Sequence, residues 1–417
     1  MAQEPDAGVG KGMTTIIRII IMACAGVLLA SALAVLAGDG EIGASDELRT
    51  TLMNSGFSSD ATMEALAQFQ SASANPVKLA KAVEVYRVML YRDPANPYSW
   101  CDLAEALQRI EKTDEARKMF ARAIELGPAI PPVQARAGNF YYLTGDVTSA
   151  VKAYSTVLST VHDYDSIVFM TLGRLGLRPQ EVVARVLPKE TVTGANYLTF
   201  VMKSGSPGDV DAVWAWLRAN KLPDDAIAGR YIDYLLQKES SSKAALTWAN
   251  YAGEHRGDYL RPNMVYNGGF KLPPAPSRLD WQIQPLEGVE TRIDSDDKGN
   301  RELDIRFGGQ VNVNYAHVSQ VVCLSPGRYH FRARIRSNGV TTNKGVQFYM
   351  SDPTGRLQWS SEPIMGTRPW TWLDEDLIVP ASQFQTLQIV RRPSEKIDSK
   401  IEGSVSIRDV SIVRVGT

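Results

Sequence analysis

The 417-residue chain is long enough for two or three domains with sizeable hydrophobic cores. Its 45 lysines and arginines balance 46 aspartates and glutamates, so the net charge of −1 offers no global basic field to nucleic acid and no acidic excess typical of disorder. The three cysteines have neither the spacing of a metal site nor that of a disulfide framework. We therefore expect a multidomain protein that binds no nucleic acid, and the helical and strand patterns along the chain predict an α + β fold.

An uncharged apolar run at residues 19–37 is the first predicted element. As a helix it would be about 28 Å long, close to one hydrocarbon thickness. Because Lys11 and Arg18 precede it, the positive-inside rule places residues 1–18 in the cytoplasm and the bulk of the chain beyond an inner membrane, in the periplasm. The alternative is a cleaved signal peptide ending at Ala37, which would make the protein secreted. Residues 38–62, rich in Ser, Gly, Asp and Thr, are predicted to form a spacer.

A 34-residue period follows over residues 63–164. Its central unit contains Trp100-x2-Leu103-Ala104-x2-Leu107, then Ala116-x3-Phe120, Ala123 and Pro128. One period earlier, Ala82, Tyr86 and Pro94 occupy the corresponding positions, and one period later Ala150 and Tyr154 do so. This pattern resembles the tetratricopeptide (TPR) repeat family, in which each helix–turn–helix unit buries its apolar face against its neighbours. The segment is therefore predicted to be an α-helical solenoid.

The TPR resemblance also implies a binding surface for a protein partner. In such proteins the inner face of the first helix of each repeat takes up peptides or protein segments. The positions that correspond to that face are Tyr98, Glu105, Gln108, Asn139 and Tyr142. The alternative is an ordinary solvated face, and the absence of a lysine or arginine cluster at these positions does not favour capture of a terminal carboxylate.

Residues 165–262 are predicted to continue the solenoid with divergent repeats. Ala212-x3-Trp216-x2-Ala219 and Ala244-x3-Trp248-x2-Tyr251 repeat the spacing of a second helix, and Tyr231 and Leu235 supply the apolar contacts expected of a partner helix. This stretch would extend and cap the helical array.

From residue 263 to the C-terminus the pattern changes to that of short strands. Tyr329, Phe331, Ala333 and Ile335 alternate with polar residues, as do Val311, Val313 and Tyr315, and turn residues separate the runs. The alternation slips by one residue at Arg408-Asp409, which predicts a β-bulge. Eight or nine such strands predict an antiparallel β-sandwich of the jelly-roll type over 263–417.

This C-terminal region resembles carbohydrate-binding modules and galactose-binding-like sandwiches. The resemblance rests on Asn267-Gly268-Gly269-Phe270 followed by Trp281, on the hairpin entry at 324–329, and on the ending Val405-Ser406-Ile407-Arg408-Asp409-Val410. It implies that Trp281 is a core residue and that Asp409 helps to hold a structural calcium. Because Lys271 stands where the family has an acidic partner, no cofactor is expected and calcium stays a minor alternative.

Aromatic residues in the sandwich are candidates for stacking against a sugar, because the C–H face of a pyranose packs against a flat ring. The candidates are Trp359, Trp370, Trp372, Tyr315 and Tyr349. Trp370 and Trp372 share strand parity, so they are predicted to face the same side. The alternative is that these rings serve packing or docking.

No phosphate loop, nucleophile elbow or dinucleotide fingerprint is present, so the chain is expected not to be an enzyme. We expect an envelope scaffold that holds a protein on the repeats and a glycan on the sandwich, in cell-surface polysaccharide assembly or export. One alternative is a glycan-active hydrolase with two carboxylates in the sandwich. Another is a docking sandwich with no sugar site.

Overall fold

The computed structural model describes residues 63–415, apart from 65–66, 69–70, 73–74, 297, 381–382 and 396–398. The N-terminus 1–18, the membrane segment 19–37 and the spacer 38–62 predicted from the sequence lie outside these residues. Among the residues that are described, no helix is both long and apolar enough to cross a membrane. The described residues divide into two compact units, with the boundary between Thr144 and Gly145.

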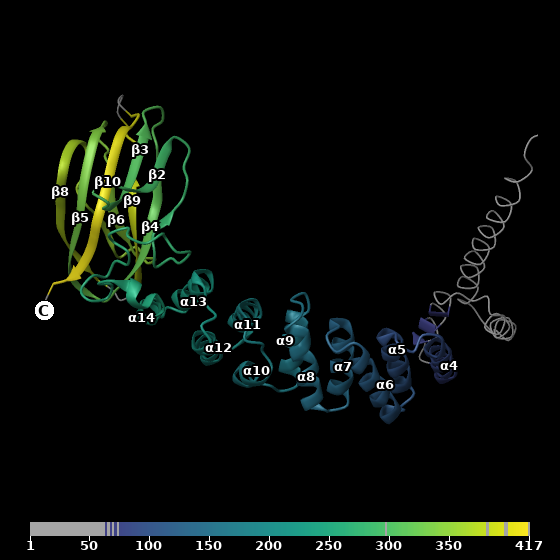
Figure 1. Cartoon of the computed structure of the whole chain (residues 1–417). Helices are drawn as coiled ribbons and strands as arrows, with labels where there is room; N and C mark the ends of the chain where they lie inside the picture. The colour runs from purple at the N-terminus through teal and green to yellow at the C-terminus, as the bar shows by residue number, and fades with distance from the viewer. Residues whose placement is uncertain are drawn as a thin grey trace, which may run out of the picture. The chain divides into compact units, whose positions relative to one another are not determined.

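The described part of the first unit consists of antiparallel helices (Figure 1). They are α4 (Pro76–Arg92), α5 (Pro97–Arg109), α6 (Thr113–Leu126) and α7 (Pro131–Leu143). Asparagine followed by proline starts two of them: the side chains of Asn75 and Asn96 accept hydrogen bonds from the first-turn amides of α4 and α5. A proline at the first helical position has no amide hydrogen to leave unpaired, so this combination starts a helix at little cost.

The core of the first unit confirms the 34-residue period. Ala116, Phe120 and Ala123 on α6 are completely buried, and the Phe120 ring packs against Phe140 of α7 with centroids 4.8 Å apart. On α4 an apolar stripe is also buried: Leu79, Val83, Tyr86 and Leu90. Helical repeats therefore form as the sequence pattern predicts.

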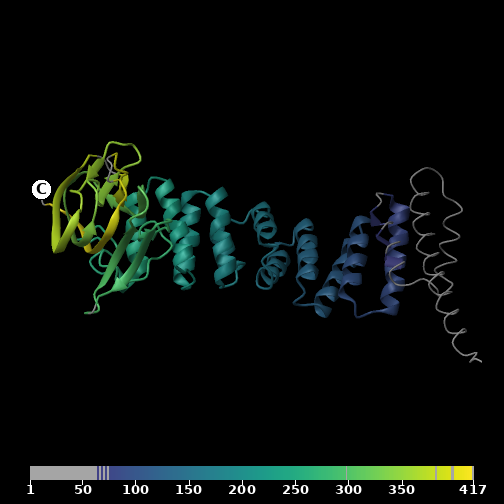
Figure 2. The same cartoon turned by 90° about the horizontal axis from the view of Figure 1, so that it is seen from above.

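The second unit begins with further helices, which lie side by side in Figure 2. They are α8 (Val147–Leu158), α9 (Asp165–Arg174), α10 (Pro179–Arg185), α11 (Thr191–Ser204), α12 (Pro207–Ala219), α13 (Asp225–Gln237) and α14 (Ser241–Ala252), followed by the short 3-10 helix η1 (Gly253–Arg256). Tyr231, Leu235 and Trp248 are buried as expected.

The apolar face of α12 differs from the predicted one. Val213, Trp214 and Leu217 are buried, whereas Ala219 is exposed and Trp216 is only half-buried. The core face of α12 is Val210-x3-Trp214-x2-Leu217, which lies two residues before the predicted Ala212-x3-Trp216-x2-Ala219.

The rest of the second unit is an antiparallel β-sandwich. Its strands are β1 (Gln282–Ile283), β2 (Val289–Ser295), β3 (Arg301–Gly308), β4 (Tyr315–Leu324), β5 (Gly327–Val340), β6 (Gln347–Ser351), β7 (Gln358–Ser360), β8 (Gly366–Val379), β9 (Gln383–Arg391) and β10 (Glu402–Arg414). They form two five-stranded sheets, β1-β4-β9-β6-β7 and β2-β3-β10-β5-β8. From β3 to β6 and again from β7 to β10, consecutive strands alternate between the two sheets, as in a jelly roll.

The core lies between the two sheets. Tyr329, Phe331, Ala333 and Ile335 are buried on β5, which confirms the predicted alternation, and Trp281 is completely buried as expected. The predicted strand at 311–315 is wrong before Tyr315, where β4 begins, and Val311 is exposed.

A buried arginine explains why residues 312–314 form no strand. Arg391 is completely buried and has no carboxylate partner among the described residues. It donates hydrogen bonds to the Asn312 side chain, to the carbonyl of Val313, and to the carbonyls of Lys344 and Ser399. The polar groups of 312–313 thus bind a side chain in place of a neighbouring strand.

The bulge predicted at Arg408-Asp409 is present: the register of β10 against β5 shifts between Arg408 and Ser411. The entry segment of the sandwich fills the irregularity. The Val410 amide donates to the carbonyl of Gly268 at 2.9 Å, and the Ile412 amide donates to the Asn263 side chain at 3.1 Å. A Cβ at position 268 would lie 2.0 Å from the Val410 oxygen, so this approach requires glycine.

Within the second unit the last helices pack directly against the sandwich. A Cβ on Gly229 of α13 would lie 2.1 Å from the carbonyl oxygen of Pro276, which leads into β1. The Trp248 ring of α14 contacts Tyr266 with centroids 5.5 Å apart, and α14 also contacts β4. Helices and sheet therefore share a tightly packed boundary in this unit.

Candidate functional site

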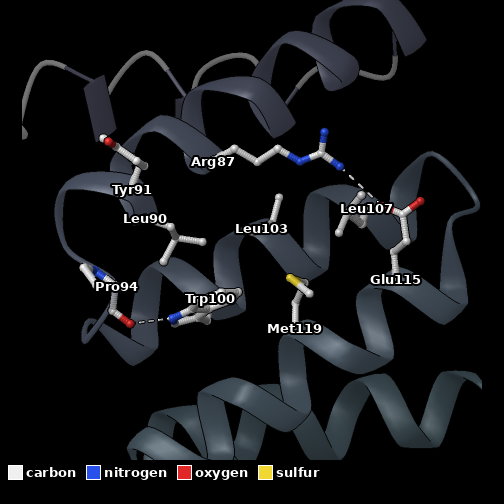
Figure 3. A pocket seen from close by; sticks show the side chains of 9 residues that line it. All are labelled: Arg87, Leu90, Tyr91, Pro94, Trp100, Leu103, Leu107, Glu115 and Met119. Atoms are coloured by element: carbon white, nitrogen blue, oxygen red, sulfur yellow. Dashed lines mark hydrogen bonds and ion pairs between the residues drawn. The ribbon is translucent and has the colours of Figure 1, made fainter.

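An open apolar pocket lies on the first unit, between α4, α5 and α6 (Figure 3). Its volume is about 410 Å³. The residues that line it are Arg87, Leu90, Tyr91, Pro94, Trp100, Leu103, Leu107, Glu115 and Met119. Figure 3 shows Leu90, Leu103 and Met119 pointing into the space from three different helices. Such a concave apolar surface can receive apolar side chains of another molecule.

Polar contacts fix the two ends of this pocket. At one end the Arg87 guanidinium on α4 makes an ion pair with Glu115 on α6 at 3.3 Å. At the other end the Trp100 indole donates a hydrogen bond to the Pro94 carbonyl at 2.9 Å, which holds the ring against the turn before α5. Tyr91 is 91% exposed at the rim. A large exposed aromatic residue beside an apolar pocket is typical of binding surfaces.

The residues predicted for a partner groove lie on a different side of α5. With 3.6 residues per turn, Trp100, Leu103 and Leu107 share one face, whereas Tyr98 and Glu105 lie on another.

On that other face Tyr98 is 45% exposed and Asn139 of α7 is exposed, while Gln108 and Tyr142 are half-buried. Glu105 is already engaged, since Arg136 of α7 makes ion pairs with Glu105 at 2.7 Å and with Asp102 at 2.6 Å.

The pocket escapes the sequence pattern because its residues have other roles in the repeat. Leu103 and Leu107 belong to the repeat pattern, and the structure buries most of both side chains and of Leu90. The available signal is an excess of apolar residues: Tyr91 and Met119 occupy positions that the repeat spacing does not require.

In the sandwich, Trp370 and Trp372 lie on the same side of β8, as their parity predicts. This is the outer, solvent-facing side of the sheet β2-β3-β10-β5-β8, because the alternate residues Leu373 and Leu377 face the core. Trp372 is 44% exposed, and β8 is an edge strand, so no further strand lies on its outer flank.

Arginines from the neighbouring strands stack on both rings. The guanidinium of Arg408 lies 4.1 Å from the Trp370 centroid, and that of Arg336 lies 4.9 Å from it. Arg332 lies 4.5 Å from the Trp372 centroid. These are cation–π contacts, which hold the rings in place. Trp370 is therefore covered from two strands, while Trp372 keeps a larger free surface.

The other three predicted sugar-stacking residues are not brought to this face. Tyr315 is completely buried, with its ring against Phe307 and its hydroxyl 2.9 Å from that of Thr291, so the expectation that it stacks on a ligand is corrected. It is the first residue of β4 and points into the core. Trp359 on β7 is partly buried and packs against Phe331, with centroids 5.0 Å apart.

Tyr349 lies on β6, in the opposite sheet. It is half-buried, on the side opposite the buried neighbours Phe348 and Met350, and the Arg392 guanidinium lies 5.4 Å from its centroid. The predicted aromatic set thus divides among the core and two separate outer faces.

Asp409, the predicted minor calcium ligand, lies in the bulge of β10 with a positive φ of 55°. In the described part of the chain, no group of three or more His, Cys, Asp or Glu side chains is placed to hold a metal ion. Calcium binding at Asp409 stays a prediction, because the described residues bring no such group of ligands to Asp409.

No family model matches the chain. A TPR repeat-containing protein of Methanocaldococcus jannaschii, MJ1428, is 26% identical over 141 residues, which are 32% of this chain and 24% of that relative. The chain thus matches less than a quarter of the relative's length.

Two solved carbohydrate-binding modules are similar to the sandwich in fold. One is a CBM4 module, which is 14% identical, covers 36% of this chain and 99% of its own, and has a TM-score of 0.28. The other, TmCBM61 in complex with β-1,4-galactotriose, is 16% identical, covers 37% and 99%, and has a TM-score of 0.26. The chain combines TPR-like helical repeats with a C-terminal antiparallel β-sandwich that resembles carbohydrate-binding modules.

Proposed function

We propose that this protein is a non-catalytic binding protein whose helical repeats hold a protein partner. The observation that carries this proposal is the open apolar pocket between α4, α5 and α6, with the 91% exposed Tyr91 at its rim. Anchoring an apolar side chain of a partner there would remove Tyr91 and the half-buried Met119 from water together. The similarity to a TPR repeat-containing protein supports the same role.

Site-specific photocrosslinking in the native organism tests this proposal. A photoreactive phenylalanine analogue at Tyr91 should trap a defined protein, and the change Met119→Glu, which places a charge in the pocket, should abolish the product. The analogue at Tyr98, on the other side of α5, is the matched control for crosslinking by proximity alone. Equal products from the two positions, or a Tyr91 product that survives Met119→Glu, would refute the pocket as the binding surface.

A second candidate function, glycan binding by the sandwich, is favoured by Trp372. This residue is 44% exposed on an edge strand, and its ring is held in place by Arg332. A rigid exposed indole can stack on the C–H face of a pyranose, and hydrogen-bonding side chains surround it on β5 and β8. A glycan array probed with the full chain tests this function, and absence of binding to every glycan would leave the sandwich as a docking domain.

We further propose that the protein acts in the cell envelope, with residues 19–37 as its membrane anchor and cell-surface polysaccharide as its setting. Alkaline carbonate washing should leave the intact chain with the membrane. A mature chain beginning near Gly38 would instead indicate a cleaved signal peptide and secretion. Incubating the full chain with the oligosaccharides it binds should give no shorter products, whereas hydrolysis would favour the glycan-active enzyme.

A further inference from the structure

Arg334 on β5 differs from the other arginines on the outer face of its sheet. Each neighbour has a carboxylate: Arg332 pairs with Asp374 at 3.1 Å, Arg336 with Glu302 at 2.8 Å, and Arg408 with Asp296 at 3.1 Å.

Arg334 makes no ion pair with any described carboxylate. Its guanidinium lies between two indoles, 5.9 Å from the centroid of Trp370 and 6.0 Å from that of Trp372.

The strand register places the unpaired charge of Arg334 beside a second positive charge. Arg334 stands directly opposite Arg408 on β10 and directly opposite Trp372 on β8. Two arginines face each other across one strand pair, and like charges in opposed positions are unfavourable. Arg332 and Arg336, two residues away on either side, turn their charges to Asp374 and Glu302. The row that runs from Arg408 to Trp372 therefore carries one positive charge that no described carboxylate of the sheet neutralises.

The arrangement places this cation beside an exposed aromatic ring. Trp372 offers an apolar surface that is 44% exposed, and Arg334 offers planar N–H donors that match a carboxylate in geometry. A single residue that carries both an apolar ring face and a carboxylate satisfies the two groups at once. A hexuronic acid in pyranose form has these two features together, whereas a neutral sugar leaves the charge of Arg334 unmatched.

We propose that the outer face around Arg334 and Trp372 binds an acidic polysaccharide, with a uronic acid ring stacked on Trp372 and its carboxylate bound by Arg334. This inference rests on the proposed glycan-binding function and specifies its ligand class. A uronic acid is favoured over an acidic peptide because a glutamate or aspartate side chain has no ring face for the exposed indole. The electrostatic part of the binding should weaken as salt is raised, since these groups lie at the surface.

Isothermal titration of the full chain with paired ligands tests the proposal. The ligands are oligomers of galacturonate, glucuronate and mannuronate, each compared with its own methyl ester, which keeps the ring and removes the charge. We expect at least one acid to bind tenfold or more tighter than its ester. Arg334→Gln should reduce the affinity for that acid to the level of the ester and leave ester binding unchanged. Arg292→Gln is the matched control, because Arg292 lies on the same sheet and already pairs with Glu290 and Asp294.

The outcomes separate the inference from the function on which it rests. Equal binding of acid and ester, lost in Trp372→Ala and unaffected by Arg334→Gln, would overturn the acidic ligand and keep the glycan-binding function. Binding of poly-glutamate, with the same dependence on Arg334 and no uronate binding, would replace the sugar by an acidic peptide. Failure of all acids, esters and neutral oligosaccharides to bind would overturn both the inference and the glycan-binding function.

Discussion

The helical repeats and the β-sandwich use exposed aromatic residues in different surroundings. On the repeats, Tyr91 stands at the rim of an apolar pocket whose walls come from three consecutive helices. On the sandwich, Trp370 and Trp372 lie on an outer face where arginines from two other strands stack on them. The proposed occupant of the first surface is an apolar protein segment, and that of the second is a sugar ring with a negative charge. The difference arises because apolar side chains surround Tyr91, whereas arginines surround Trp370 and Trp372.

The largest effect is expected from a charge in the repeat core. Ala116→Asp would bury a carboxylate without a partner where α5 and α6 meet, at a cost of more than about 3 kcal/mol. Because repeats are stabilised mainly by their neighbours, the helices α4–α7 should unfold together while the sandwich keeps its structure. Circular dichroism would follow the helices, and with Trp100 replaced by phenylalanine the tryptophan fluorescence would report only on the second unit, so the two transitions can be separated. A melting curve identical to that of the wild type would contradict the repeat assignment.

In the core of the sandwich, the corresponding destabilising change is at the buried Arg391. Arg391→Met would leave the carbonyls of Val313, Lys344 and Ser399 without a donor, at a cost of about 3 kcal/mol. Here the loss should appear in the sandwich transition and spare α4–α7. Arg392→Met, at the exposed next position, is the matched control and should change the free energy of unfolding little. Equal effects of the two changes would show that the buried hydrogen bonds of Arg391 do not stabilise the fold.

The boundary between α13 and the sandwich can be tested with one methyl group. Gly229→Ala would place a Cβ 2.1 Å from the Pro276 oxygen, so helix and loop must separate, at a cost of about 2–3 kcal/mol. Gly173→Ala on α9 is the control, because nothing lies within 4 Å and alanine favours a helix. Chemical denaturation should show a lower midpoint for Gly229→Ala alone. A midpoint that is not lowered would mean that this contact is looser than the structure indicates.

A smaller, pH-dependent effect is expected from Asp280 beside the same boundary. Burial raises the pKa of Asp280 to about 6, although the amides of Ala275 and Trp281 and the Asn267 side chain favour the carboxylate. A pKa above the unfolded value of about 3.9 means that this group stabilises the fold below about pH 4 and that the contribution is lost as the pH rises through about 6.

The expected change across that pH range is about 2 kcal/mol. Asp280→Asn should flatten this part of the pH profile of unfolding measured with denaturant. The opposite result would be a wild-type stability that rises from pH 4 to 6 and a rise that Asp280→Asn removes. It would show that folding lowers the pKa of Asp280 rather than raising it.

Periodicity and parity predicted the parts of the fold that depend on neighbours in sequence. Ala116 and Phe120 are buried because a repeat must bury them, and Trp370 and Trp372 share a side because strands alternate. Parity could not tell which side faces the core, so Tyr315 was misassigned. The arginines on the tryptophans come from β5 and β10, far away in sequence, and the pocket requires three helices at once. Sites assembled from distant residues were therefore beyond the sequence pattern.

One pair of measurements on the full chain, affinity for a glycan and thermal stability, tests the binding role of the Trp372 face most directly. Trp372→Ala should lower glycan affinity tenfold or more and change the free energy of unfolding by less than about 1 kcal/mol, because the exposed ring contributes mainly a cation–π contact to the fold. Tyr349→Ala, in the opposite sheet, should leave affinity unchanged. Unchanged affinity in Trp372→Ala together with a loss of several kcal/mol of stability would show that the ring serves packing and that this face is not the binding site.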